Sequence, residues 1–180
     1  MAHSVEQRAI TAEAANAAVV AAVAKAGELG IRINAAVTDA SGVLAAFLRM
    51  PGAFLHSVDI AIDKAYTAAG FGFATSQWAG ILQGDEALRL GMPVRPRNVV
   101  FGGGLPMREG GVLIGGIGVS GGSAEQDEIC ARAALVALGA NDAMRGLDPA
   151  LAEAHLDRIL ARLKAAGVRT LLVGMLAPPN

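Results

Sequence analysis

The chain has 180 residues, 53% of them hydrophobic and 17% charged, a length that suits one domain with or without an appendage. Its 15 basic and 16 acidic side chains form no basic stripe, and no window holds the roughly 18 consecutive apolar residues of a membrane span, so neither nucleic acid nor a membrane is an expected partner. The N-terminus has no signal-peptide pattern and the single cysteine, Cys130, cannot form an internal disulfide, so the expected location is the cytoplasm.

The first half of the chain predicts a helix, a hairpin and a second helix. Residues 5–29 are Ala-rich and stop at Gly30, which is typical of a helix and its end. Two runs of strand-forming residues in "IRINAAVTDASGVLAAFLRM" flank Gly42, which predicts a β-hairpin. In "HSVDIAIDKAYTAAG" apolar residues recur at helical spacing.

The middle of the chain predicts short helices, three strands and a long helix. Helical pieces are expected near residues 76–82 and 85–90, followed by a strand at "VVFGG". The stretch "LPMREGGVLIGGIGVS" predicts a second hairpin that turns at Gly110-Gly111. A helix should open after Ser123, because Ser123 and Gln126 can form a capping box.

Strands joined by tight turns are antiparallel, so this order predicts an α+β fold with helices packed on an antiparallel sheet. After Leu138 the pattern changes to a loop, a helix that begins near Asp148-Pro149, and the apolar strand "VRTLLVG". We therefore expect one domain at residues 1–138 and a C-terminal αβ appendage at residues 139–180. Because the appendage carries apolar faces without a sheet of its own, we expect it to dock on the domain or to swap between subunits.

Four stretches, "VTDASGVLAAFLRMPGA", "SVDIAIDKAYTAAGF", "GGGLPM" and "GGIGVSGGSAEQDEICARAA", resemble the GlcG/HbpS family, which includes the C-terminal domain of PduO-type adenosyltransferases. The resemblance covers about residues 10–138 and departs at Pro51, where the family usually has Asp. It implies a five-stranded antiparallel sheet, self-association into dimers or higher oligomers, and in some members the binding or degradation of haem, or iron binding.

Two glycine-rich segments point to a ligand site near the start of the last helix. They contain Gly103, Gly104, Ser120 and Gly121, and the N–H groups of such a helix start favour an anion such as a carboxylate or a haem propionate. The alternative is that these glycines only permit tight turns and close sheet packing.

Charged and iron-binding side chains complete the candidate list. Arg49 and Lys64 are candidates to meet a ligand carboxylate, or else a strand-end arginine and a solvated helix lysine. His56, at the start of the second helix, is the first candidate for an axial haem ligand, or else a surface histidine. The other candidates for an axial ligand are His3, His155, Tyr66 and Cys130.

A hydrolase is the rival interpretation. Gly118-Val119-Ser120-Gly121-Gly122 fits G-x-S-x-G, which would make Ser120 a nucleophile. Residues 138–180 resemble a fragment of SGNH (GDSL-type) esterases, in which Asn141 would donate to an oxyanion, although the serine block and the D-x-x-H block of that family are missing. Three functions therefore stay open: a haem or small-ligand binding protein with or without activity on its ligand, a serine esterase, and an accessory structural subunit without catalysis.

Overall fold

The computed structural model describes residues 2–144, 157 and 161. The chain divides into two compact units, Met1–Leu138 and Gly139–Asn180, and the first unit contains the sheet and most of the described helices. The expected appendage lies outside the described residues, apart from the end of one helix and two single positions. Its docking or swapping stays a prediction.

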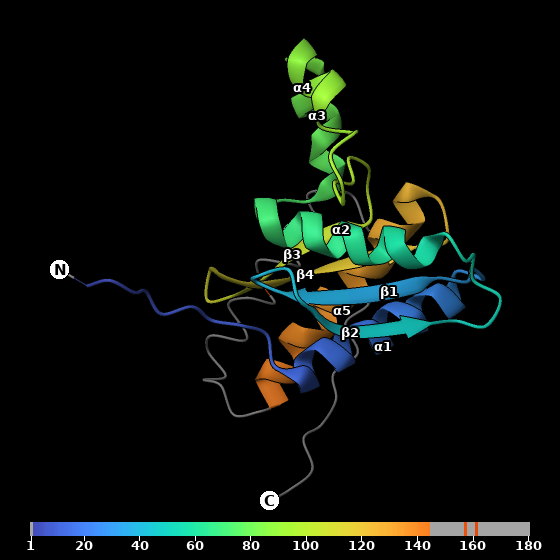
Figure 1. The fold of residues 1–180 in the computed structure, drawn as a ribbon. Coiled ribbons are helices and arrows are strands. Elements are labelled where there is room, and N and C mark those ends of the chain that lie inside the picture. The colour runs from blue at the N-terminus through green and yellow to red at the C-terminus, as the bar shows by residue number, and fades with distance from the viewer. Residues whose placement is uncertain (1, 145–156, 158–160, 162–180) are drawn as a thin grey trace, which may run out of the picture. The chain divides into compact units, whose positions relative to one another are not determined.

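The described elements alternate between helices and hairpins, as Figure 1 shows. In chain order they are α1 (Ala12–Glu28), β1 (Asn34–Asp39), β2 (Leu44–Arg49), α2 (Ser57–Phe71), η1 (Thr75–Gln77), α3 (Trp78–Gln83), α4 (Glu86–Gly91), β3 (Gly104–Glu109), β4 (Val112–Ser120) and α5 (Ala124–Met144).

Four antiparallel strands form one sheet in the order β2-β1-β4-β3. Both predicted hairpins are confirmed, and the glycines at their turns have positive φ, which is +81° at Gly42 and +57° at Gly110. The α+β architecture is thereby confirmed.

The expected fifth strand at residues 99–103 is absent from the part of the chain that the structure describes. The N–H of Val99 donates to Thr67 Oγ1 of α2 at 3.0 Å, so this backbone is held by a helix side chain rather than by a strand. Gly103 has a φ of +113°, which breaks the extended conformation just before β3 begins.

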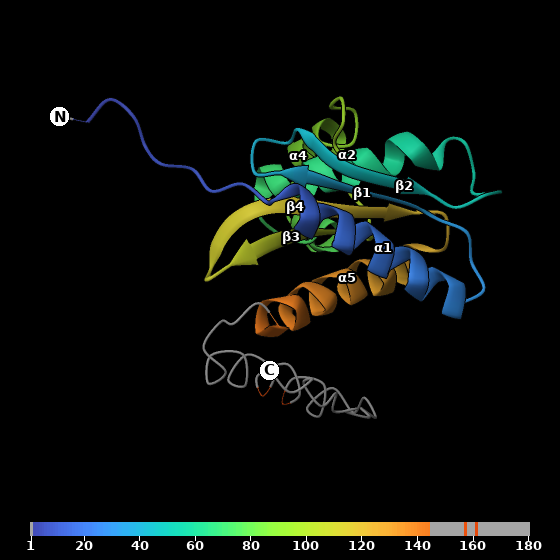
Figure 2. The ribbon, with the colours of Figure 1, turned by 90° about the horizontal axis from the view of Figure 1, so that it is seen from below.

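Helices cover both faces of the sheet (Figures 1 and 2). Apolar residues of α1 and α5, including Val19, Ala22 and Cys130, share one buried cluster with Val37 and Ile117 of the sheet. On the other face, Ala61 and Ala65 of α2 pack against the sheet around Ala36. Since alternate strand residues point to opposite faces, β1 contributes to both layers and is buried along most of its length.

Glycines in β4 let α2 lie close to the sheet. A Cβ atom at Gly116 would come within 2.4 Å of the carbonyl oxygen of Ala65, and one at Gly118 within 2.1 Å of that of Ala61. Non-bonded atoms do not approach each other this closely. Gly116 and Gly118 are therefore required for close packing of α2 on the sheet, which confirms the alternative interpretation of the glycines at these two positions.

Two helix boundaries differ from the prediction. The first helix begins at Ala12 instead of residue 5, because Thr11 caps it by accepting from the N–H of Ala14 at 3.2 Å. At the other end of the domain, α5 continues to Met144, so the residues from Gly139 to Asp142 belong to a helix and not to the expected loop. Alanine and methionine favour a helix enough to offset the cost of about 1 kcal/mol for one glycine.

No helix of the described residues is long and apolar enough to cross a membrane.

Candidate functional site at the glycine-rich end of the sheet

Most predicted site residues lie at one end of the sheet. Here β1 begins at Asn34, β2 ends at Arg49, β3 begins at Gly104 and β4 ends at Ser120, with Asn34 opposite both Arg49 and Ser120 in the strand register. The N-termini of α2 and α5 follow directly, so His56 and Gly121 join the same region. We call this region, which consists of the four strand ends, residues 50–56 and residues 121–123, the glycine-rich end.

Lys64 is fully buried and is not the solvated helix lysine of the alternative interpretation. Its Nζ donates to Asp127 Oδ2 and to the carbonyl oxygen of Val119, both at 2.8 Å, and lies 4.9 Å from the centre of the Phe101 ring. Because Asp127 balances its charge and the side chain has no exposed surface, this arrangement does not present Lys64 to a ligand carboxylate.

Burial shifts the pKa of both Lys64 and Asp127 in the direction that favours the neutral form of each side chain. Burial lowers the pKa of Lys64, and the negative charge of Asp127 partly offsets this effect. Burial likewise raises the pKa of Asp127, opposed by the charge of Lys64 and by hydrogen bonds from backbone N–H groups. The sequence analysis missed Asp127, whose only local signal was its place in the first turn of the predicted helix.

The glycine-rich segments surround this pair. A Cβ atom at Gly103 would lie 2.6 Å from Lys64 Nζ, and one at Gly121 would lie 2.3 Å from the carbonyl oxygen of Arg32. The N–H of Gly122 donates to Asp127 Oδ1 at 2.9 Å, so the carboxylate of the chain itself occupies the anion position that the sequence analysis assigned to a ligand. The capping box between Ser123 and Gln126 is confirmed by hydrogen bonds of 3.0 and 3.2 Å.

Ser120 is 5% exposed at the end of β4, and among the described residues no histidine hydrogen-bonds to it. A serine nucleophile needs a neighbouring base, so this geometry does not support an esterase. Its strand partner Asn34 is fully buried, with Nδ2 donating to the carbonyl oxygen of Phe54 at 3.2 Å and Oδ1 without a partner in the described chain. Asn34 therefore ties residues 50–56 to the sheet, a role that the sequence analysis missed.

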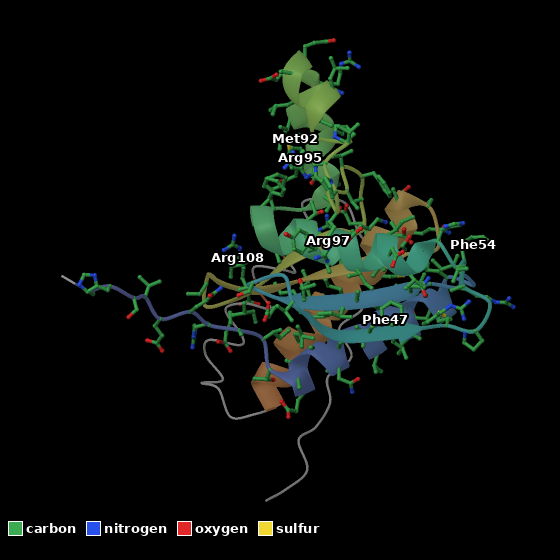
Figure 3. All side chains as sticks on the ribbon, viewed as in Figure 1. Phe47, Phe54, Met92, Arg95, Arg97 and Arg108 are labelled. Atoms are coloured by element: carbon green, nitrogen blue, oxygen red, sulfur yellow. The ribbon has the colours of Figure 1, made fainter. Side chains whose placement is uncertain are left out.

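Residues 50–56 present an exposed apolar surface beside a histidine. Phe54 and Leu55 are 69% and 76% exposed, and His56 is exposed immediately before α2, where its side chain makes no capping hydrogen bond. Figure 3 shows Phe54 projecting at this end of the molecule.

Two arginines flank the same segment. Arg49 Nη2 donates to the carbonyl oxygen of Ala53 at 2.7 Å, and Arg32 lies against Gly52, where a Cβ atom would meet its Nη1 at 2.5 Å. Neither arginine has an acidic partner in the described part of the chain. Arg32 was missed by the sequence analysis, because its proximity to residues 50–56 depends on the fold.

A cavity of about 510 Å³ opens beside the first turns of α5. Phe101 lines it together with Glu125 and Glu128, and Glu128 is paired with Arg132. The carboxylate of Glu125 has no cationic partner among the described residues, which disfavours an anionic ligand in this cavity.

The remaining iron-binding candidates lie apart from this end or are inaccessible. Cys130 is buried under the sheet, Tyr66 lies beneath the guanidinium of Arg97, and His3 is exposed near the N-terminus. Within residues 2–144 no group of three metal-binding side chains could hold a metal ion. His155 and the side chain of Asn141 lie outside the described residues, as does most of the segment for which the sequence analysis expected an SGNH esterase fragment.

Comparisons with known proteins agree with this fold. Residues 10–136 match the family model of the haem degrading protein HbpS-like family. The chain is 39% identical over 119 residues to the corrinoid adenosyltransferase PduO of Salmonella typhimurium, which is 66% of this chain and 35% of that protein. The chain therefore spans about a third of the length of this relative.

Two solved structures are similar to this chain. The Klebsiella pneumoniae protein ORFY superimposes with a TM-score of 0.71 at 32% identity, covering 82% of this chain and 99% of that protein. A PduOC:haem complex superimposes with a TM-score of 0.67 at 35% identity, covering 72% of this chain and 94% of that one.

Proposed function

Since this chain belongs to the family of HbpS-like haem degrading proteins, we propose that it binds haem at the glycine-rich end of its sheet. The similarity to a chain solved as a haem complex is the observation that carries the proposal. A haem site needs an axial donor for the iron, an apolar surface for the porphyrin and cationic groups for the two propionates.

The residues at this end fit those demands. His56 offers an imidazole for the iron, Phe54 and Leu55 offer apolar surface, and Arg32 and Arg49 would hold the propionates. When bound, haem supplies a redox-active iron, while the chain orients the porphyrin and sets the solvent access of its propionates.

A haem titration of the full chain tests this proposal. We expect a Soret band that saturates at one haem per chain and that weakens at least about tenfold in His56→Ala, because the axial bond is lost. His3→Ala is the matched control, since His3 is also exposed but lies outside the glycine-rich end. A band that is absent, or that is the same in His56→Ala, contradicts the proposal.

We further propose that the chain degrades the haem that it binds, and its membership of the HbpS-like family supports this activity. With ascorbate and oxygen, we expect the Soret band of the bound haem to decay faster than that of free haem. Decay at the rate of free haem would leave a binding protein without this reaction. Saturable binding of iron salts, together with no binding of haem, would point to iron as the ligand instead.

We also propose that the chain self-associates, as the family resemblance implies, and that it does so through β2. β2 pairs only with β1 among the described strands, and its neighbourhood exposes Val43, Leu44 and Leu48 by 63%, 45% and 36%. An exposed apolar edge strand is a template for pairing with another chain. Analytical ultracentrifugation should give an oligomer that Leu48→Lys dissociates, and an unchanged mass would refute this interface.

A further inference from the structure

A second cavity lies at the opposite end of α2 from His56. It has a volume of about 320 Å³ and opens between Gly70 and its neighbours on α2 and residues 92–98. Figure 3 shows Met92 and Arg95 next to each other and Arg97 below them, all away from Phe54. We call this cavity the α2 pocket.

The rim of the α2 pocket carries excess positive charge. Arg97 Nε donates to Asp63 Oδ1 at 2.8 Å, so these two charges balance each other. Arg95 is exposed and has no ion-pair partner in the described part of the chain. An anionic group that entered the pocket would therefore meet one uncompensated guanidinium.

The backbone holds Arg97 in an unusual conformation. Its φ is +62°, the single positive value of a non-glycine residue in the described chain. Its guanidinium lies 3.8 Å from the centre of the Tyr66 ring, and its carbonyl oxygen accepts from Thr67 Oγ1 at 3.0 Å. Strained residues that several contacts fix in place are common at ligand sites.

Polar and apolar groups both line the space below Arg95. Phe71 is 47% exposed here, which leaves ring surface for a flat ligand, whereas the guanidinium of Arg97 already covers the Tyr66 ring. Asn98 Nδ2 donates to the carbonyl oxygen of Met92 at 2.8 Å, whereas its Oδ1 is buried with no partner in the described chain. A hydroxyl group of a ligand would satisfy this acceptor.

Gly70 supports a binding role independently of these charges. It lies in the last turns of α2 and lines the pocket, yet a Cβ atom there would meet no other atom within 4 Å. Glycine weakens a helix, and no packing contact in the described structure requires it at this position. Its missing side chain keeps the floor of the pocket open.

We propose that the α2 pocket binds a small organic carboxylate with a flat apolar body and a hydroxyl group. The carboxylate pairs with Arg95, the flat body packs on Phe71, and the hydroxyl donates to Asn98 Oδ1. This ligand differs from haem in size and in location.

NMR titration of the full chain with 4-hydroxybenzoate tests the proposal. We expect saturable shifts of the amide signals of Tyr66, Gly70 and Asn98. Gly70→Leu should weaken binding at least about tenfold because its side chain fills the pocket, and Arg95→Gln should do the same because the ion pair is lost. The neutral analogue 4-hydroxybenzamide should bind at least about tenfold more weakly than the acid to the unsubstituted chain.

Matched controls keep the result interpretable. Gly80 also has no atom within 4 Å of a Cβ position but lies on α3, and Arg89 is paired with Glu86 on α4, so Gly80→Leu and Arg89→Gln should bind as the unsubstituted chain does. A melting temperature of Gly70→Leu that equals or exceeds that of the unsubstituted chain shows that the fold is intact. No saturable shift at these amides, or equal affinity in Gly70→Leu, overturns the proposal.

Discussion

Lys64 and Asp127 illustrate how a residue that reads as a surface lysine can be central to a fold. Lys64 is completely buried, and its ammonium contacts Asp127 and a strand carbonyl at 2.8 Å. Removal of one partner leaves the other charge buried without compensation. We predict that Lys64→Met lowers the free energy of unfolding by about 3 to 5 kcal/mol at neutral pH, measured by urea denaturation.

Two further variants separate this effect from a general loss of charge. The double variant Lys64→Met with Asp127→Leu should recover much of the loss, because no buried charge is left, although the N–H of Gly122 still lacks its acceptor. Lys25→Met, which breaks the exposed pair with Glu28, should cost less than about 1 kcal/mol. If Lys64→Met costs as little as Lys25→Met, the pair does not hold this part of the fold together.

Cys130 gives the fold a pH dependence of known sign. Burial, helped by the charge of Asp127, raises the pKa of its thiol from 9.0 to about 11. The folded chain therefore keeps a proton that the unfolded chain loses above about pH 9, so the free energy of unfolding falls between about pH 9 and pH 11. Relative to Cys130→Ala, we predict a loss of about 2 kcal/mol at pH 11, measured by urea denaturation across this range. Parallel pH profiles of the two proteins would disprove it.

Which residues were predictable depends on the distance between partners along the chain. The capping box joins Ser123 to Gln126, three residues apart, and the sequence analysis predicted it correctly. The partner of Lys64 is 63 residues away, and the contact of Arg32 with Gly52 depends on how loops meet at the end of the sheet. Such contacts follow from the tertiary fold, and a single sequence holds no local signal for them.

At the scale of the elements, the glycines of β4 set how closely α2 approaches the sheet. A Cβ atom at Gly118 would lie 2.1 Å from the oxygen of Ala61 and 2.4 Å from the nitrogen of Ala65, so Gly118→Ala must push the helix away. We predict a loss of about 3 kcal/mol in the free energy of unfolding, measured by thermal denaturation.

A helix glycine without close neighbours is the control for this prediction. Gly27 is exposed in α1, and no atom lies within 4 Å of a Cβ position there. Gly27→Ala should stabilise the chain by up to about 1 kcal/mol, because alanine favours a helix. The same small effect at Gly118 would show that α2 does not press against β4.

Elements with local signals were predicted correctly, and those that depend on competing partners were not. Both hairpins are fixed by turn glycines next to alternating strands, so the sequence was sufficient. Residues 99–103 have strand-forming side chains, yet their backbone bonds to Thr67 of α2. The end of α5 was misplaced because the resemblance to an esterase suggested a loop where the local residues favour a helix.

At the scale of the molecule, the two proposed sites lie at opposite ends of α2. His56 precedes the helix, whereas Gly70 lies near its C-terminus, so the sites are separated by about 20 Å at 1.5 Å per residue. Haem and a small carboxylate should therefore bind without direct contact. The resemblance to the HbpS-like family was visible in the sequence, and the match of residues 10–136 to the model of that family confirms it.

The most direct test of the central claim is where bound haem lies on the chain. Paramagnetic ferric haem broadens the amide signals of nearby residues, and zinc protoporphyrin is the diamagnetic control. In the ratio of the two NMR spectra, we predict the strongest broadening at residues 52–57 and at residues 120–123. The strongest broadening around Gly70 and residues 92–98, or near His3, would contradict a haem site at the glycine-rich end.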